Sequence, residues 1–453
     1  MILKSINPYT NKTLKEFKEL SDRQVKELLI QSGEAFKLWK KTSFDHRKSL
    51  MEKAAVLLRS NRNEYAETIT LEMGKPVKES RAEVEKCAWV CEYYGKNAEQ
   101  FLSAEPVKTD ADLSYVNFEP LGTILGVMPW NFPFWQVFRF AVPTLVAGNT
   151  VLLKHASNAQ ICAETIESVF KGAGFPPDVF RNLVIGSAGV EKIIKHDIIK
   201  AVSLTGSDLA GQKVAEAAGS VLKKCVLELG GSNAFIVLED ANIQKAAETG
   251  IRARFQNAGQ NCIAAKRFIP VRKISDKFLE LFLEGIRKLK TGNPSEEDTD
   301  IGPLSSVKQA EIVEDQVKRS VAQGARIITG GVRDNAFYQP TVVVDVKPGM
   351  PLFDEEVFGP VAPFTVADDE EDAITLAGRT HYGLGVSLFT DDLKKANDLV
   401  SEFHDGAVFI NGLVKSDPRL PFGGTRGSGY GRELAIQGIR ESVNVKAVWA
   451  RKL

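Results

Sequence analysis

The spacing of apolar and polar residues along the chain changes near residue 150. Residues 46–100 are rich in Ala, Leu, Glu and Lys. Their apolar positions recur every three or four residues, which predicts helices after a short extended start. Residues 113–117 and 123–128 are short apolar runs and predict strands. We therefore expect the first part of the chain to be mostly helical, with two strands at its end.

Beyond residue 150, short apolar runs alternate with amphipathic segments. This alternation predicts strands at 151–154, 182–185, 198–204 and 226–229, with helices at 159–171, 190–195 and 211–218 between them. Strand–helix–strand units of this length indicate a parallel sheet covered by helices. Open sheets of this kind bind ligands at the carboxyl ends of their strands.

A second alternating block starts at residues 235–238, includes a long helix at 277–289 and continues to Ile410. This block predicts a separate α/β domain. Residues 443–449 then suit a terminal strand. The length of 453 residues also favours two or three domains over one.

Composition narrows the possible functions. Lys plus Arg and Asp plus Glu both number 58, so no net charge attracts nucleic acid or an anionic membrane. No apolar run reaches the roughly 18 residues of a membrane span, and residues 1–15 lack a signal-peptide core. The five sparse cysteines argue against a disulfide framework. We expect a cytoplasmic protein whose partners include neither nucleic acid nor membrane.

Cys262 is the candidate nucleophile. Gly259 and small residues around it leave room for a substrate, although a thiol with an ordinary pKa of about 8.5 must be activated to attack at neutral pH. A buried, inert cysteine is the commoner alternative. Cys87 and Cys91 share a helix face, but no His or Cys partner is nearby, so they indicate packing and no metal site.

Three other segments carry polar groups that suit catalysis or binding. Glu228 lies in an apolar strand before two glycines, where a raised pKa would suit a general base; an N-cap or a salt bridge is the alternative. Asn131 lies between two prolines in a rigid loop and is either an oxyanion donor or a simple turn residue. Residues 205–207 follow a predicted strand and open a helix, which favours a cofactor phosphate, although the G-x-G-x-x-G fingerprint is absent.

Taken together, these segments resemble the aldehyde dehydrogenase superfamily over essentially the whole chain. The spacing between Glu228 and Cys262 is also that of the family. The shared motifs lie, in order, at residues 7–10, 39, 72–75, 129–133, 152–154, 205–207, 228–231, 259–262, 356–360, 421–424 and 428–433.

The resemblance implies an α/β fold of the aldehyde dehydrogenase type. A Rossmann-type cofactor domain would span residues 1–229, with residues 102–120 contributing to an oligomerisation hairpin. An α/β catalytic domain would span 230–420, and residues 421–453 would return to the cofactor domain and form an oligomerisation tail. The family's habit of pairing this tail with a neighbouring subunit implies a homodimer or homotetramer.

The resemblance also implies roles for single residues. Cys262 would attack an aldehyde, Glu228 would be the general base that hydrolyses the resulting thioester, and Asn131 with the Cys262 backbone amide would form the oxyanion hole. The residues implied to bind the cofactor, NADP or NAD, are Met128, Pro129, Trp130, Lys154, Ser157, Gly206, Ser207, Leu229, Glu356 and Phe358.

Ser157 bears on the choice of cofactor. Many relatives have a glutamate at this position, which chelates the ribose hydroxyls and repels a 2′-phosphate. Ser157 removes that repulsion, so the resemblance implies that NADP is accepted beside NAD. No role follows for the neighbouring His155.

Local strings at 153–156, 223–229 and 264–269 are similar to short bacterial succinate-semialdehyde dehydrogenases. In those enzymes an arginine at the position of Arg139 binds the distal carboxylate of the substrate, and Ser428 matches a second contact. Arg139 lies in an apolar stretch, so it needs an anionic partner, either a protein carboxylate or the substrate's own. Larger relatives carry an arginine where this chain has Gln256, so the preference for succinic semialdehyde rests mainly on Arg139.

Other functions on the same fold stay open at this point. One is a broader specificity for small aldehydes. Another is an acylating dehydrogenase that passes the thioester to coenzyme A, which Glu228 argues against because such enzymes commonly lack the hydrolytic base. A third is a structural protein without activity, which the presence of Cys262, Glu228 and Asn131 argues against.

Overall fold

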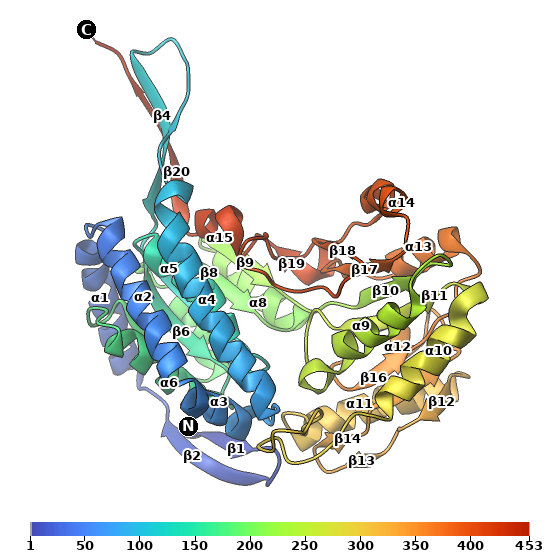
Figure 1. The fold of residues 1–453 in the computed structure, drawn as a ribbon. Helices are drawn as coiled ribbons and strands as arrows, with labels where there is room; N and C mark the ends of the chain where they lie inside the picture. Colours follow the sequence, from blue (N-terminus) through green and yellow to red (C-terminus); the bar gives the residue numbers. More distant parts are fainter. Residues whose placement is uncertain (1, 453) are drawn as a thin grey trace.

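The computed structural model describes residues 2–452 and shows two α/β lobes side by side (Figure 1). The chain starts with an antiparallel hairpin of β1 (Ile2–Asn7) and β2 (Lys12–Lys18), and four helices follow, which confirms the helical prediction for this part. These helices are α1 (Asp22–Trp39), α2 (Phe44–Ser60), α3 (Arg62–Met73) and α4 (Val77–Phe101). Ser21 and Ser43 cap the first two by accepting backbone N–H bonds, which fixes where those helices begin.

The first lobe is built on a six-stranded sheet in the order β19-β9-β8-β5-β6-β7. Its parallel strands are β5 (Thr123–Met128), β6 (Thr150–His155), β7 (Phe180–Asn182), β8 (Ile199–Thr205) and β9 (Lys224–Glu228). The connecting helices are α5 (Trp135–Val146), α6 (Gln160–Gly172), α7 (Val190–Ile194) and α8 (Asp208–Gly219), with a 3-10 turn (Ser187–Gly189) before α7. The predicted parallel sheet is thus confirmed.

One strand in this sheet is shorter and earlier than the sequence pattern indicates. We expected a strand at 182–185, but β7 ends at Asn182 because residues 180–182 pair with residues 151–153 of β6. Leu183 and Ile185 are still buried in the core. Their buried apolar side chains explain why the sequence pattern predicts a strand here, although their backbone no longer pairs with β6 as a strand.

The second lobe confirms the predicted α/β block. Its main sheet is parallel and has the order β11-β10-β17-β18, from β10 (Asn233–Val237), β11 (Ala265–Pro270), β17 (Val386–Phe389) and β18 (Val408–Ile410). Smaller strands are β12 (Arg326–Thr329), β13 (Arg333–Asp334), β14 (Phe337–Tyr338), β15 (Thr341–Val344) and β16 (Val361–Pro363).

Six helices and two 3-10 turns complete this lobe. The helices are α9 (Ile243–Phe255), α10 (Arg272–Ile286), α11 (Val307–Ala322), α12 (Pro351–Asp354), α13 (Glu370–Gly378) and α14 (Leu393–Asp398). The 3-10 turns are Gln256–Gly259 and Leu399–Glu402. The predicted long helix at 277–289 is α10, which begins five residues earlier because the isolated pairing of Val271 with Ala367 ends the strand region there.

The end of the chain returns to the first lobe. A 3-10 turn (Arg426–Ser428) leads into β19 (Gly429–Tyr430), which pairs with β9, and then into α15 (Ala435–Glu441). Strand β20 (Val443–Ala450) confirms the predicted terminal strand and pairs with β4 (Leu113–Pro120), which also pairs with β3 (Glu105–Pro106). This ribbon projects from the body of the molecule (Figure 1) and exposes Leu113, Val445 and Trp449.

Within residues 2–452, no helix has both the length and the apolar character to cross a bilayer. The chain passes from the first lobe to the second between β9 and β10 and returns between β18 and β19. The residues predicted to form a site lie near these crossings. The domain limits at residues 229 and 420 stay a prediction.

Candidate active site

The turn that carries Cys262 has an unusual backbone. Helix α9 ends at Phe255, and Asn257 and Ala258 then adopt left-handed φ angles of 51° and 52°, followed by Gly259 at 74°. A Cβ on Gly259 would lie 2.3 Å from the carbonyl oxygen of Gly359. Only glycine fits at this point. The strained turn sets the direction in which the chain runs from the end of α9 to Cys262.

A buried arginine holds this turn in place. Arg254 is fully buried, and its guanidinium donates to the backbone carbonyl groups of Ala265 (3.1 Å), Val357 (3.0 Å) and Gly359. These carbonyls belong to β11 and to the loop after α12, whereas Arg254 itself belongs to α9. Its side chain therefore joins three segments around the nucleophile.

Asn131 lies against the same turn from the other lobe. Its side-chain amide donates to the carbonyl of Gln260 (3.1 Å), and its backbone carbonyl accepts from the side chain of Asn257 (2.8 Å). A primary amide has two N–H donors, so the second N–H of Asn131 stays available to a substrate oxygen. The structure thus brings Asn131 next to the segment that precedes Cys262.

Cys262 lies where two cavities meet. One has a volume of about 460 Å³ and is lined by Arg139, Gln256, Lys86 and Phe422 among others; the second, of about 260 Å³, also contains Asn131. Burial raises the pKa of the Cys262 thiol to about 11, although the positive charges of Arg139 and Lys266 act in the opposite direction. The thiol is therefore protonated at neutral pH in this state of the protein.

The second cavity contains most of the residues predicted to bind a cofactor. Those that line it are Pro129, Trp130, Gly206, Ser207, Leu229, Glu356 and Phe358. Trp130 and Phe358 meet edge to face at 5.7 Å, and Ser207 caps the N-terminus of α8. A Cβ on Gly230 would lie 2.6 Å from Glu356 Oε2, so the backbone here makes a close-fitting wall. A helix N-terminus, aromatic rings and a carboxylate at the carboxyl edge of a parallel sheet fit a dinucleotide.

Glu356 is itself positioned by Lys266. The Lys266 ammonium pairs with Glu356 and also donates to the carbonyl groups of Gly231 (2.6 Å) and Cys262 (3.2 Å). The Gly231 amide donates to Glu356 at 3.1 Å. These contacts join the nucleophile segment to the cofactor cavity.

The remaining predicted cofactor residues lie outside that cavity, at the ends of β5 and β6. Met128 is buried at the end of β5, and Lys154 is buried near the end of β6. Lys154 forms no ion pair within residues 2–452, and burial lowers its pKa. A buried, unpaired cation at this edge suits a phosphate or a ribose oxygen, and Ser157 lies three residues further on, partly exposed.

His155, which the sequence left without a role, has a structural one. Its Nε2 is 2.9 Å from the carbonyl of Pro133, and its Nδ1 accepts the Ala156 backbone N–H at 2.8 Å. Burial lowers the pKa of His155 to about 4, so the ring is neutral and Nε2–H is the donor. The side chain thereby fixes the loop that carries Asn131.

The Glu228 carboxylate is enclosed and lines neither cavity. Neither of its oxygens has a hydrogen-bond donor among residues 2–452. A Cβ on Gly423 would lie 2.7 Å from its Oε1. Burial and then the negative charge of Glu433 raise the pKa of Glu228 well above the ordinary range, whereas Arg139 acts to lower it. A carboxyl group of raised pKa agrees with the base chemistry predicted for it.

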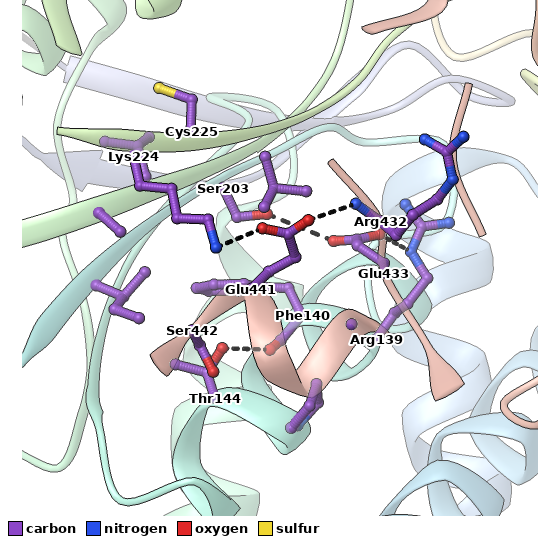
Figure 2. A pocket seen from close by; sticks show the side chains of 16 residues that line it. Arg139, Phe140, Thr144, Ser203, Lys224, Cys225, Arg432, Glu433, Glu441 and Ser442 are labelled. Carbon is purple, nitrogen blue, oxygen red and sulfur yellow. Dashed lines mark hydrogen bonds and ion pairs between the residues drawn. The ribbon is translucent and has the colours of Figure 1, made fainter. Parts of the chain in front are cut away.

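Arg139 has a protein partner. Its Nε pairs with Glu433, and Ser203 donates to the other Glu433 oxygen at 3.4 Å (Figure 2). The Nη2 of Arg139 donates to Thr205 at 3.2 Å. Arg139 also lines the larger cavity with Cys262. Of the two partners considered from the sequence, the structure thus supplies the protein carboxylate, and the cost of burial no longer requires a substrate carboxylate at Arg139.

The two other predicted substrate residues differ in their placement. Gln256 lines the cavity with Cys262, as expected. Ser428 is fully buried; it donates to the carbonyl of Gly230 (2.6 Å) and accepts from the Gly383 amide (3.0 Å). Its hydroxyl therefore joins the segment before β19 to Gly230, where the chain crosses between the lobes. Ser428 does not line the larger cavity that contains Cys262.

Sequence reasoning missed Asn257, Arg254 and Lys266, which are all buried and all contact the Cys262 segment. The one signal in the sequence was that these three polar residues all lie within eight residues of Cys262. Within residues 2–452, no group of three or more His, Cys, Asp or Glu side chains is arranged to hold a metal ion.

The first prediction concerns the thiol. Alkylation of Cys262 by iodoacetamide should rise about tenfold per pH unit from pH 7 toward pH 10, because the thiolate is the nucleophile and its pKa is about 11. A Cys262→Ser variant should lose this modification, since the other four cysteines are buried. Alkylation that levels off below pH 8 would contradict the raised pKa.

The second prediction concerns the buried ion pair. Arg139→Gln leaves Glu433 buried without a cation and should lower the free energy of unfolding at pH 7 by about 3–5 kcal/mol. Urea unfolding measures this change. Arg272→Gln, which breaks an exposed pair with Asp368, should cost no more than about 1 kcal/mol. Equal losses in the two variants would show that the Arg139–Glu433 pair is not a stabilising contact.

The chain is similar to several known proteins over nearly its whole length. The chain is 46% identical to a probable succinate-semialdehyde dehydrogenase [NADP(+)] of Synechocystis over 99% of this chain and the whole relative. It is 42% identical to the succinate semialdehyde dehydrogenase [NAD(P)+] Sad of Escherichia coli, covering 99% and 98% of the two chains. A crystal structure of succinic semialdehyde dehydrogenase from Streptococcus pyogenes with NADP+ superposes with a TM-score of 0.97 at 36% identity, covering 99% and 100%.

The resemblance inferred from the motifs is thereby confirmed at the level of the whole chain, including the α/β fold. The model of the aldehyde dehydrogenase family matches residues 2–448. This chain therefore belongs to the aldehyde dehydrogenase family.

Proposed function

We propose that the chain catalyses the NAD(P)+-dependent oxidation of succinic semialdehyde to succinate, with Cys262 as the nucleophile. The observation that carries this proposal is the position of one thiol at the junction of two cavities, of which one fits a dinucleotide and the other carries cationic side chains. The full-length relatives named for this activity support it.

The first step is loss of the Cys262 thiol proton to solvent and addition of the resulting thiolate to the aldehyde carbon. The second N–H of Asn131 and the backbone N–H of Cys262 donate to the oxyanion that forms. Asn131 is held by Gln260 and Asn257, so this donor is oriented before the substrate arrives. A preorganised donor of this kind is worth on the order of 10² to 10³ in rate.

A bound nicotinamide supplies the acceptor for the hydride that leaves the adduct, and a thioester on Cys262 is left. Glu356, Phe358, Trp130, Gly206 and Ser207 would hold the cofactor in the smaller cavity. Met128, Lys154 and Ser157 would lie on its adenosine side. An uncharged Ser157 and the unpaired Lys154 both suit the 2′-phosphate of NADP.

Hydrolysis of the thioester requires a base, which we assign to Glu228. Its raised pKa means that the proton-accepting form becomes more populated as the pH rises. The presence of Glu228 distinguishes this reaction from transfer of the acyl group to coenzyme A. It also distinguishes the chain from a structural protein, for which a buried, unpartnered carboxylate would be a cost without a use.

The third prediction tests the function directly. Purified protein with succinic semialdehyde should reduce NADP+ or NAD+, and kcat/KM should exceed that for butanal, which has the same length without the charge. A charge-assisted contact to the carboxylate accounts for roughly a tenfold or larger preference. Cys262→Ala should abolish both reactions and keep cofactor binding. Equal kcat/KM values for the two aldehydes would replace this proposal with a broad-specificity enzyme.

We also propose that the protein is a homodimer or homotetramer in the cytoplasm. The projecting β4–β20 ribbon exposes apolar residues and offers strand edges to a second copy, and five free cysteines suit a reducing compartment. Light scattering at micromolar concentration should give the mass of an oligomer. A truncation after Ser442, which removes β20, should shift that mass toward the monomer; a full-length monomer would refute the proposal.

A further inference from the structure

The larger cavity beside Cys262 contains a cation that none of the predicted roles uses. Lys86 lies on α4 and faces this cavity. Its ammonium donates to the hydroxyl of Ser416 at 2.7 Å and lies 4.1 Å from the ring centre of Trp135. Burial, and then the positive charge of Arg139, lowers the pKa of Lys86 to about 7.

Lys86 has no carboxylate partner within residues 2–452. The acidic groups near it are already engaged. Glu83 accepts from Lys75 and from the backbone amides of Phe134 and Trp135. Asp417 accepts one hydrogen bond from Nε and one from Nη2 of Arg419. An ammonium group in a desolvated wall without a counter-charge is unfavourable, and this cost is relieved when an anion enters the cavity.

This arrangement contrasts with Arg139, which faces the same cavity but is neutralised by Glu433. The two cations also repel each other, since Arg139 acts to lower the pKa of Lys86. A carboxylate that enters from the cavity thus gains most at Lys86, because the nearby carboxylates of Glu83 and Asp417 are already paired with other cations.

The donors at Lys86 are suited to a carboxylate. Ser416 Oγ already accepts two hydrogen bonds, from Lys86 and from the indole N–H of Trp135 at 3.0 Å. Its own O–H is therefore directed elsewhere. The ammonium has three N–H groups and uses one of them on Ser416. Together they offer two N–H donors and one O–H donor, which two carboxylate oxygens can accept.

We propose that Lys86, with Ser416, is the receptor for the distal carboxylate of the aldehyde substrate and a determinant of specificity. Arg139 then affects the site indirectly, through its ion pair with Glu433 and through the effect of its positive charge on Lys86 and Cys262. This inference rests on the proposed oxidation of a carboxylated aldehyde and assigns its selectivity to a residue outside the shared family motifs.

The test compares kcat/KM for succinic semialdehyde and butanal in wild-type protein and in Lys86→Met and Lys86→Arg. Lys86→Met should lower kcat/KM for succinic semialdehyde about ten- to a hundredfold, mainly through a higher KM, and should leave butanal little changed. Lys86→Arg, which keeps the charge, should recover much of the loss. Turnover of butanal reports that each variant is folded.

Lys96→Met is the matched charge control. Lys96 is exposed on the same helix as Lys86 and lines neither cavity, so its removal takes away the same charge without the same desolvation, and salt screens its effect. A Lys86→Met enzyme that keeps the wild-type preference for succinic semialdehyde, or that loses both substrates equally, would overturn the inference and leave the proposed function standing. A wild-type enzyme without that preference would refute the proposed substrate, and the inference with it.

Discussion

The geometry of the site depends on the buried guanidinium of Arg254. A fully buried arginine without a carboxylate is stable only if carbonyl dipoles surround it, and here the carbonyls come from two separate segments, β11 and the loop after α12. Those segments cannot move apart without leaving the charge unsatisfied. The left-handed turn at Asn257 and Ala258, which would be strained in isolation, is held by this requirement.

A second set of buried charges joins α5 and the C-terminal segment to the sheet of the first lobe. Glu228 and Glu433 lie near Arg139, and Arg432 also acts on Glu228. Burial raises the pKa of both carboxyl groups, and the negative charge of Glu433 raises that of Glu228 further. The same group of residues thus stabilises the contact between α5 and the C-terminal segment and sets the proton affinity of the base.

The sequence predicted the parts of the structure that depend on local pattern. Alternating apolar runs gave the parallel sheet, and family motifs gave the residues that surround the smaller cavity, such as Glu356 and Phe358. The pattern could not show that Glu433, almost three hundred residues from Arg139, would supply its counter-charge, nor that Ser428 would be used by the backbone of Gly230. The sequence also could not single out Lys86, because a lysine on a helix has the same neighbours in the sequence whether its side chain faces solvent or a cavity.

His155 gives the fold an acid limit. The ring holds the Asn131 loop only while its Nδ1 is free to accept the Ala156 amide. Its pKa in the folded protein, about 4, is lower than the value of about 6.5 for an unfolded chain. The unfolded state therefore binds a proton first as the pH falls below about 6.5, and the stability that neutral His155 contributes declines until the pH passes about 4. Between these two pH values the ring in the folded protein stays neutral and keeps the Asn131 loop in place, so mild acid lowers the stability of the whole fold while the folded molecules keep the geometry of the oxyanion donor.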